Sequence, residues 1–144
     1  MRISTKGRYA LHLMLDLAIN HTGSYISLKA VAQRQGISDK YLEQIIHLLS
    51  KAGLVQSARG AQGGYRLARD PKDYTVGEIL RLAEGSLSPV HCLDCSSPCE
   101  KIQSCITVSL YRRIQDAIDS VVDHTTLDDL VQEYCRKNTV DYTI

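Results

Sequence analysis

Four cysteines lie within fourteen residues, at Cys92, Cys95, Cys99 and Cys105. The chain has five cysteines, so they cannot all pair, and its first residues do not follow the pattern of a secretory leader. In the reducing cytoplasm, clustered cysteines bind metal or carry out redox chemistry more often than they form disulfides. The cluster therefore predicts a metal centre or a redox site in a cytoplasmic protein.

The intervals between the cysteines indicate which centre fits them. Two residues separate Cys92 from Cys95, three separate Cys95 from Cys99, and five separate Cys99 from Cys105. A structural zinc site prefers two close pairs of ligands, whereas iron-sulfur clusters accept thiolates at looser spacing. An iron-sulfur cluster is therefore favoured, with zinc, a thiol redox pair or unrelated buried thiols as alternatives.

Other potential ligands in the sequence are weaker candidates. His91, Asp94 and Glu100 flank the cysteines and could bind or support a metal, but they are expected to be exposed loop residues. Cys135 lies thirty residues beyond the cluster in an amphipathic stretch, where a single cysteine is expected to be a small apolar filler. It is not assigned to the site.

The elements around the cluster must position it. Residues 86–105, the cysteine segment, hold two prolines and several serines and are predicted to be a long loop. A long amphipathic helix is predicted from Ile106, and its apolar stripe requires a partner helix. That stripe comprises Leu110, Ile114, Ala117, Ile118, Val121 and Val122. Thr126 is predicted to cap a short last helix that packs back on the domain.

The residues before the cysteine segment predict a winged helix-turn-helix. Three helices are expected, over 6–20, 28–35 and 39–52, capped by Thr5, Ser27 and Ser38. The glycine-rich GAQGG between LVQSAR and YRLA predicts a two-stranded wing, and Thr75 is expected to cap a fourth helix that ends at Gly85. The expected fold class is mainly α with a small β-hairpin wing. Its expected parts are a DNA-binding domain over 1–85, the cysteine-rich loop over 86–105, and a helical part over 106–144.

The net charge of +1 conceals an uneven distribution. Residues 1–69 carry ten lysines and arginines against three acidic residues, a net +7, whereas residues 70–144 carry seven against thirteen, a net −6. The basic half predicts a polyanion as partner and the acidic half a different task. Two solvated faces are the alternative interpretation.

The predicted third helix offers a polar surface to a DNA groove. Its outer face comprises Asp39, Lys40, Glu43, Gln44 and His47, and its inner face Leu42, Ile45, Ile46 and Leu49. Gln44 could pair with adenine, and Glu43 could accept from the cytosine amino group. Lys40 and Ser38 could reach phosphates or guanine, and Tyr41 could donate to a phosphate.

The wing and the first helix are expected to contact the DNA backbone. Arg59 precedes Gly60 at a tip that can approach a narrow minor groove. Lys6, Arg8 and Arg66 are expected phosphate contacts. The alternative is a small helical protein with a solvated polar face.

Several motifs resemble one known family. The opening RISTKGRYA, the YLEQ of the third helix, the wing RGAQGGY and a cysteine loop before a long helix are similar to the IscR-like iron-sulfur cluster regulators, with relatives NsrR and CymR. The resemblance spans residues 1 to about 130. It implies a homodimer that pairs through a long dimerisation helix and binds a palindromic operator in double-stranded DNA.

The resemblance also implies a cluster on three cysteines, which match Cys92, Cys99 and Cys105 best. A 2Fe-2S cluster is favoured over 4Fe-4S, and such clusters are often lost in air. Two positions depart from the IscR pattern: the first interval is one residue longer and contains Cys95, and Val108 stands where a histidine ligand is expected. Cys95 is the first choice for the fourth ligand, and a residue from elsewhere, including the other subunit, is the second.

The sequence thus predicts a transcription regulator whose promoter binding depends on an iron-sulfur cluster that senses iron, redox state or nitric oxide. The cluster is expected to set the distance between recognition helices that bind half-sites about 34 Å apart. One alternative is a cluster-free repressor of cysteine or sulfur metabolism that responds to thiol oxidation or a partner, and another is a zinc-stabilised DNA-binding module. No catalytic constellation and no membrane span are evident, so neither an enzyme nor a membrane protein is expected.

Overall fold

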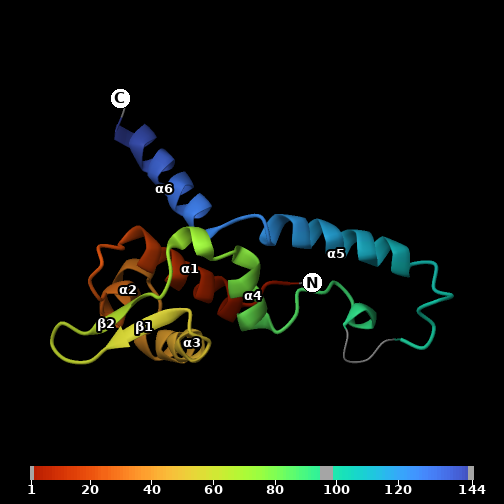
Figure 1. Cartoon of the computed structure of the whole chain (residues 1–144), viewed down its shortest axis with the longest axis horizontal. Helices are drawn as coiled ribbons and strands as arrows, with labels where there is room; N and C mark the ends of the chain where they lie inside the picture. The colour runs from red at the N-terminus through yellow and green to blue at the C-terminus, as the bar shows by residue number, and fades with distance from the viewer. Residues whose placement is uncertain (1, 95–98, 143–144) are drawn as a thin grey trace.

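The computed structural model describes residues 2–94 and 99–142, which form a mainly helical body with one small hairpin at its edge (Figure 1). Two short 3-10 turns, Pro71–Asp73 and His91–Leu93, flank α4. The elements in chain order are α1 (Thr5–Ile19), α2 (Leu28–Gln35), α3 (Asp39–Lys51), β1 (Val55–Ala58), β2 (Gly64–Leu67), α4 (Val76–Glu84), α5 (Val108–Val122) and α6 (Leu127–Tyr142). The predicted fold class, mainly helical with a two-stranded wing, is confirmed.

Side-chain caps begin each of the first four helices. Ser27, Ser38 and Thr75 accept backbone N–H groups at the starts of α2, α3 and α4, as the sequence predicts. The expected cap of α1 at Thr5 is wrong, because Ser4 accepts the Gly7 N–H at 3.1 Å and Thr5 is already helical. The helix-turn-helix corner follows Gln35, where Gly36 adopts a left-handed φ of 65° that closes α2.

A buried carboxylate fixes α1 against α2. Asp16 is 3% exposed, and Arg34 donates to both of its oxygens, at 2.7 and 3.1 Å. Gln35 and Asn20 donate to the same carboxylate. Because the charge is paired and its lone pairs are occupied, the two helices are joined at a defined angle.

The wing is an antiparallel hairpin tied back to the helices. Val55 pairs with Leu67 and Ala58 with Gly64, and Tyr65 exchanges two backbone hydrogen bonds of 2.8 Å with Ile26. A side chain at Gly64 would collide with the Ile26 carbonyl, so glycine allows this close approach.

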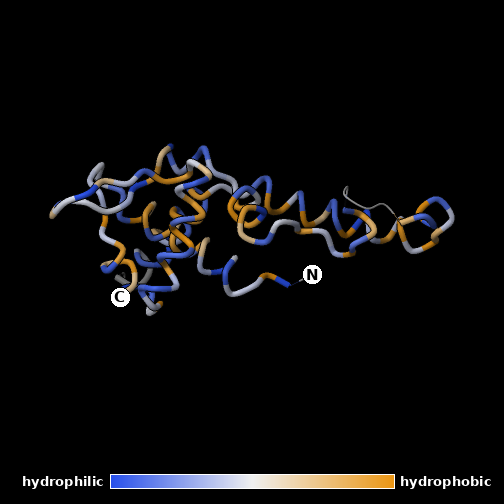
Figure 2. Tube along the Cα trace, turned by 90° about the horizontal axis from the view of Figure 1, so that it is seen from below, coloured by the Kyte–Doolittle hydropathy of each residue, from blue (hydrophilic) through white to orange (hydrophobic). Residues whose placement is uncertain are grey.

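The principal core lies among α1, α2, α3 and the wing, where the tube in Figure 2 is mostly hydrophobic on the inside. Tyr74 is fully buried and its hydroxyl donates to the Leu54 carbonyl at 2.6 Å. Leu127 at the start of α6 joins the same core, and its N–H donates to the Tyr74 carbonyl. The beginning of α6 is therefore part of the winged-helix body.

Helix α5 extends away from this body, and residues 99–105 of the cysteine segment lie at its far end (Figure 1). Only its carboxyl-terminal half packs on the body, where Ile118 and Val122 contact a small cluster of Val76, Leu80 and Leu87. Helix α6 begins with a reciprocal box between Thr126 and Asp129 and reaches Tyr142, so it is longer than predicted. No described helix is long and apolar enough to cross a membrane.

Candidate nucleic-acid interface and cysteine segment

Helix α3 presents a polar side to solvent. The exposed residues are Asp39, Lys40, Glu43, Gln44 and His47, and the buried ones are Leu42, Ile45, Ile46 and Leu49. This division matches the predicted faces, because the four apolar residues recur at helical spacing and pack into the principal core. An exposed polar helix of this size is an element that can enter a major groove.

The start of α3 lies beside the first turns of α1. The Ser38 hydroxyl accepts the Tyr41 N–H at 3.3 Å, and the Tyr41 ring meets the Tyr9 ring edge to face, with centroids 5.5 Å apart. Thr5 and Ile37 complete a surface pocket of about 400 Å³ at this junction. The half-buried Tyr41 is therefore held in place rather than free in solvent.

The cations of the winged helix fall into two groups. Arg34, Arg69 and Arg81 form ion pairs with Asp16, Glu78 and the α5 carboxylates. By contrast, several exposed cations of residues 1–69 form no ion pair or side-chain hydrogen bond within the described part of the chain: Arg2, Lys6, Arg8, Lys29, Lys40, Lys51 and Arg59. The seven unpaired cations of the basic half are available to phosphates, and four of them, Lys6, Arg8, Lys40 and Arg59, are predicted DNA contacts.

Arg66 does not belong with those four cations. Its guanidinium donates to the Gly23 carbonyl at 2.9 Å and to Gln56 at 3.1 Å, and it stacks over the Tyr25 ring. Cross-strand and loop partners thus hold the Arg66 guanidinium on the protein surface, and its contact with phosphate stays a prediction.

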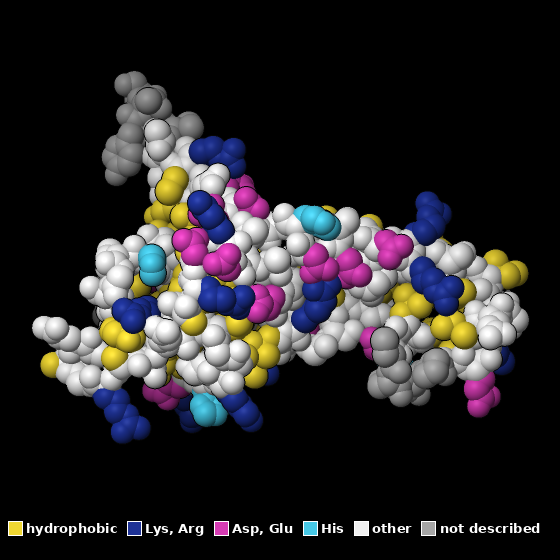
Figure 3. All heavy atoms as spheres, viewed as in Figure 1, with side chains coloured by type: hydrophobic (Ala, Val, Ile, Leu, Met, Phe, Trp, Pro, Cys, Tyr) yellow, Lys and Arg dark blue, Asp and Glu magenta, His cyan; other side chains and the backbone are white. Residues whose placement is uncertain are grey.

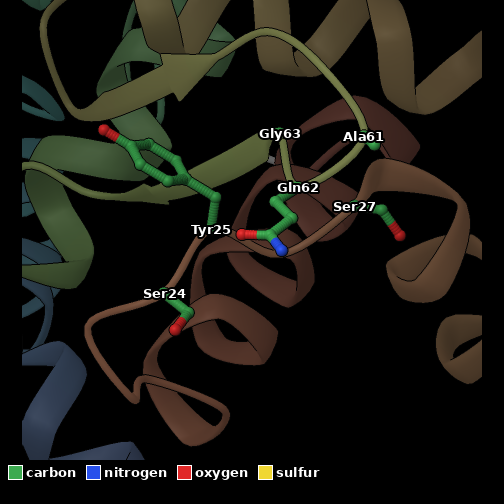
Figure 4. Close-up of a pocket in the computed structure, with 6 residues that line it drawn as sticks. All are labelled: Ser24, Tyr25, Ser27, Ala61, Gln62 and Gly63. Carbon is green, nitrogen blue, oxygen red and sulfur yellow. The ribbon is translucent and has the colours of Figure 1, made fainter.

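A pocket of about 500 Å³ separates the wing tip from the segment before α2 (Figure 4). Ala61, Gln62 and Gly63 line it from the wing, and Ser24, Tyr25 and Ser27 line it from the other side. The neighbouring Arg59 and Gly60 are exposed, and their contact with a minor groove stays a prediction. Figure 3 shows Lys and Arg side chains along the lower edge of the winged helix, whereas Asp and Glu gather around the junction of α4, α5 and α6.

The cysteine segment packs on the body through Leu87, whereas its described thiols are exposed or half-buried. Cys92 is half-buried in the short turn His91–Leu93, Cys105 is half-buried just before α5, and Cys99 is exposed. Cys95 lies outside the described residues. Among the residues that are described, no three His, Cys, Asp or Glu side chains gather closely enough to hold a metal ion. Three thiols on one accessible segment are nonetheless a donor set that suits an iron-sulfur cluster.

Hydrogen bonds favour the thiolate of Cys105. Its sulfur lies 3.1 Å from the Thr107 hydroxyl, and hydrogen bonds from the Thr107 side chain and backbone lower the pKa of this thiol. The thiolate is the form that binds metal and attacks disulfides, so the local structure prepares Cys105 for either chemistry.

The other candidate ligands near the cysteines interact with each other or with Ser86, or are exposed. Asp94 accepts from Ser86 at 2.7 Å and lies 3.6 Å from the strongly exposed His91 ring, while Glu100 is exposed. The expectation that Cys135 fills core space is wrong, because its side chain is exposed on α6.

The apolar residues of α5 divide into two groups. Val108 is buried and Ile118 and Val122 face the body, but Leu110, Ile114, Ala117 and Val121 are exposed. The exposed residues are four, three and four positions apart, which is the spacing of the seam in a coiled coil. The sequence predicts a single apolar stripe, but the structure divides it into a side that packs on the protein and an exposed side. The exposed side has no partner among the described residues.

An ionic clamp joins α5 to α4. Arg81 donates to Asp119 at 2.7 Å and also pairs with Asp123, and its hydrogen bond to Asp123 lowers the pKa of that carboxyl. A side chain at Gly77 would collide with Asp123 and Val122, so the two helices meet at close range. The clamp fixes the body end of α5 and leaves the cysteine end extended.

Comparisons with known proteins agree on one family. A model of the Rrf2 family, described as iron-dependent transcriptional regulators, matches residues 3–133. The chain is 46% identical over 130 residues to the HTH-type transcriptional regulator CymR of Bacillus subtilis, covering 90% of this chain and 89% of that protein. The solved CymR structure, titled the global cysteine regulator of B. subtilis, superposes with a TM-score of 0.77 at 44% identity, over 92% of this chain and 98% of that one.

IscR proteins are also similar. The HTH-type transcriptional regulator IscR of Escherichia coli is 38% identical over 131 residues, covering 91% of this chain and 80% of that protein. A structure of T. potens IscR has a TM-score of 0.75 and 41% identity, over 93% of this chain and 88% of that one. These relatives are transcriptional regulators and not enzymes, in agreement with the lack of a catalytic constellation in the sequence.

Proposed function

The chain belongs to the Rrf2 family of DNA-binding transcriptional regulators, and we propose that it binds a palindromic operator as a homodimer under the control of its cysteine segment. Such a regulator acts in the cytoplasm, where it meets the chromosome. The observation that carries the proposal is that Lys6, Arg8, Lys40 and Arg59 are exposed and unpaired, as are Arg2, Lys29 and Lys51, whereas Arg34, Arg69 and Arg81 are held in ion pairs.

The proposed interface assigns different tasks to its residues. Gln44 and Glu43 lie on the exposed side of α3 and would read base edges in the major groove. Lys6, Arg8 and Lys40 would contact phosphates. The wing tip at Arg59 and Gly60 would enter the adjacent minor groove, and the hydroxyls of Ser38 and Tyr41 would lie near the backbone.

The exposed seam of α5 supports the homodimer. A second copy of the same helix would cover Leu110, Ile114, Ala117 and Val121, and a two-fold axis there would place two winged helices on successive half-sites. Half-sites one turn apart require recognition helices about 34 Å apart, so the direction of α5 determines whether both can bind.

The proposed sensor is an iron-sulfur cluster held by Cys92, Cys99 and Cys105, with 2Fe-2S favoured and with Cys95 or a residue from elsewhere as fourth ligand. When bound, such a cluster supplies a redox- and oxygen-sensitive group. The chain's own contribution is an accessible segment with a Cys105 thiol of lowered pKa, joined directly to α5. Drawing the three thiols together would restrain the cysteine segment and the first turn of α5. This restraint would shift the equilibrium between two geometries of the dimer.

A cluster-free thiol switch is the second candidate. It is supported by the similarity to CymR and by the separate positions of the described thiols. In that case oxidation of Cys105, with a neighbouring thiol as partner, would change the same segment without iron.

The DNA proposal is tested with a duplex that the purified chain selects from a random-sequence pool. The expected result is enrichment of a palindrome that binds one dimer, with affinity falling steeply as salt rises. Failure to enrich any sequence, together with binding that is insensitive to salt, would refute operator recognition.

Anaerobic purification then separates the two sensors. Matched iron and sulfide on the chain, lost in a variant with serine at Cys92, Cys99 and Cys105, supports the cluster. Iron-free protein whose DNA affinity responds to a disulfide oxidant supports the thiol switch instead, and bound zinc that ignores oxidants supports neither.

A further inference from the structure

The last turn of α4 contacts the first turn of α1 through one carboxylate. Glu84 accepts two hydrogen bonds from Ser4, at 2.8 Å from its backbone N–H and 2.7 Å from its hydroxyl. The same hydroxyl accepts the Gly7 N–H and caps α1. A chain of hydrogen bonds therefore runs from α1 through its cap to a residue eighty positions away.

The fit between the two helices is close. Gly7 is buried, and a Cβ at this position would collide with the Glu84 carboxylate. Glu84 also places a negative charge at the amino-terminal end of α1, where backbone N–H groups lack helical partners and the helix dipole favours an anion. Both features hold the first turn of α1 in one position.

This turn carries two of the unpaired cations, Lys6 and Arg8, which the proposed function assigns to DNA phosphates. We propose that Glu84 is a positioning residue for DNA binding, which holds this turn so that Lys6 and Arg8 meet the backbone. The inference rests on the proposed function, since it explains how one part of that interface is kept in place.

The position of Glu84 in the chain gives the contact a second consequence. Gly85 follows directly and ends α4, and the cysteine segment begins one residue later. One turn earlier, Arg81 holds Asp119 and Asp123 of α5. The last turn of α4 thus contacts both the first turn of α1, which carries Lys6 and Arg8, and α5, which follows the cysteine segment.

The test compares Glu84→Ala with Glu84→Gln in the full-length chain. Both substitutions remove the same charge, so general attraction to DNA changes equally, but the glutamine oxygen can still accept both hydrogen bonds from Ser4. Affinity is measured as a function of salt on the duplex that the wild type selects and on an unrelated duplex. Thermal melting of each variant confirms that it is folded at the assay temperature.

Glu84→Ala is expected to bind both duplexes about fivefold or more weakly than Glu84→Gln, the effect of one weakened helix cap. The slope of log affinity against log salt should become shallower by about 0.9 for each phosphate that the protein no longer neutralises, whereas Glu84→Gln should keep the wild-type slope. Combining Ser4→Ala with Glu84→Ala should weaken binding by less than the sum of the two single effects, because both substitutions remove the hydrogen bond between the two side chains.

Equal affinities and slopes for the alanine and glutamine variants would overturn the inference, as would a melting temperature that falls while affinity and slope stay unchanged. Additive effects of Ser4→Ala and Glu84→Ala would also contradict it. If the wild type selects no duplex and its binding ignores salt, the proposed function itself fails and the inference falls with it.

Discussion

The winged helix and the arm formed by the cysteine segment and α5 differ in how completely they are packed. In the winged helix, Leu13 and Leu42 are fully buried and the Asp16 carboxylate receives four side-chain hydrogen bonds. In the arm, Ile106 is 91% exposed and Val121 is 63% exposed. A region packed like the first keeps one conformation by itself, whereas a region like the second depends on a ligand or partner. The difference favours DNA reading by the body and sensing by the arm.

The largest expected contrast is in stability. Leu42→Ala should lower the free energy of unfolding by about 2 to 5 kcal/mol, because it opens a cavity in the principal core. Serine at Cys92, Cys99 and Cys105 should change that free energy by only about 0.5 kcal/mol at each position in metal-free protein, since these thiols have little packing. Urea unfolding measures both, with the exposed Glu43→Ala as control. A cysteine variant as unstable as Leu42→Ala would show that the arm is part of the core.

The second contrast concerns the exposed seam of α5. Ile114→Asp should yield a folded monomer that binds the selected palindrome about 100-fold more weakly, because the second half-site no longer adds to the first. Sedimentation and DNA titration check both effects. The control is Arg112→Asp, which lies away from the seam and makes the net charge more negative than Ile114→Asp does. If Arg112→Asp weakens DNA binding more than Ile114→Asp, repulsion from DNA explains the loss and dimer dissociation does not.

The third contrast separates two kinds of DNA contact within the body. Gln44→Ala should weaken binding to the selected duplex by about 1 to 3 kcal/mol and leave unrelated DNA unaffected. Arg8→Ala should weaken both duplexes alike and reduce the salt slope by about 0.9. The two variants serve as each other's control, and identical behaviour of both would remove the distinction between base reading and phosphate contact.

The smallest expected effect lies where body and arm meet. Hydrogen bonds from Arg81 lower the pKa of Asp123 below its ordinary value of 3.8. A lowered folded-state pKa stabilises the protein above the unfolded value, and this stabilisation is lost as pH falls through the folded value. Wild type should therefore exceed Asp123→Asn in stability by up to about 1 kcal/mol above pH 4.

Below that range the two proteins should converge as the carboxylate takes up its proton. Urea unfolding from neutral to acidic pH checks this, at low salt so that an exposed ion pair is not screened. A constant difference between wild type and variant at every pH would show that Asp123 contributes through packing and not through its charge.

The body is the more predictable region, because its signals are local. The caps Ser27, Ser38 and Thr75, and the buried side of α3, follow from residue types at fixed spacing, and the structure contains them all. The predicted cap of α1 is wrong by one residue because the choice between Ser4 and Thr5 depends on Glu84, which no local pattern reveals.

Long-range partners explain the other differences. Arg66 and Arg8 look alike in the sequence, but only Arg66 has Gln56 across the hairpin and the Gly23 carbonyl within reach. The α5 residues are predicted to form one stripe, although Ile118 packs on the body while Ile114 remains exposed. The cysteine chemistry can be inferred from residue types and spacing. The positions of the thiols relative to one another depend on a bound cofactor or partner, and the spacing in the sequence does not determine them.

The most direct test of the division between body and arm is DNA affinity measured anaerobically for three samples on one selected duplex. These are the protein as purified, the same protein after metal removal, and the variant with serine at Cys92, Cys99 and Cys105. Control by the arm predicts that the first differs from the other two, that those two agree, and that all three are folded. Equal affinity of all three, with iron and sulfide present on the first, would contradict control of DNA binding by the cysteine segment.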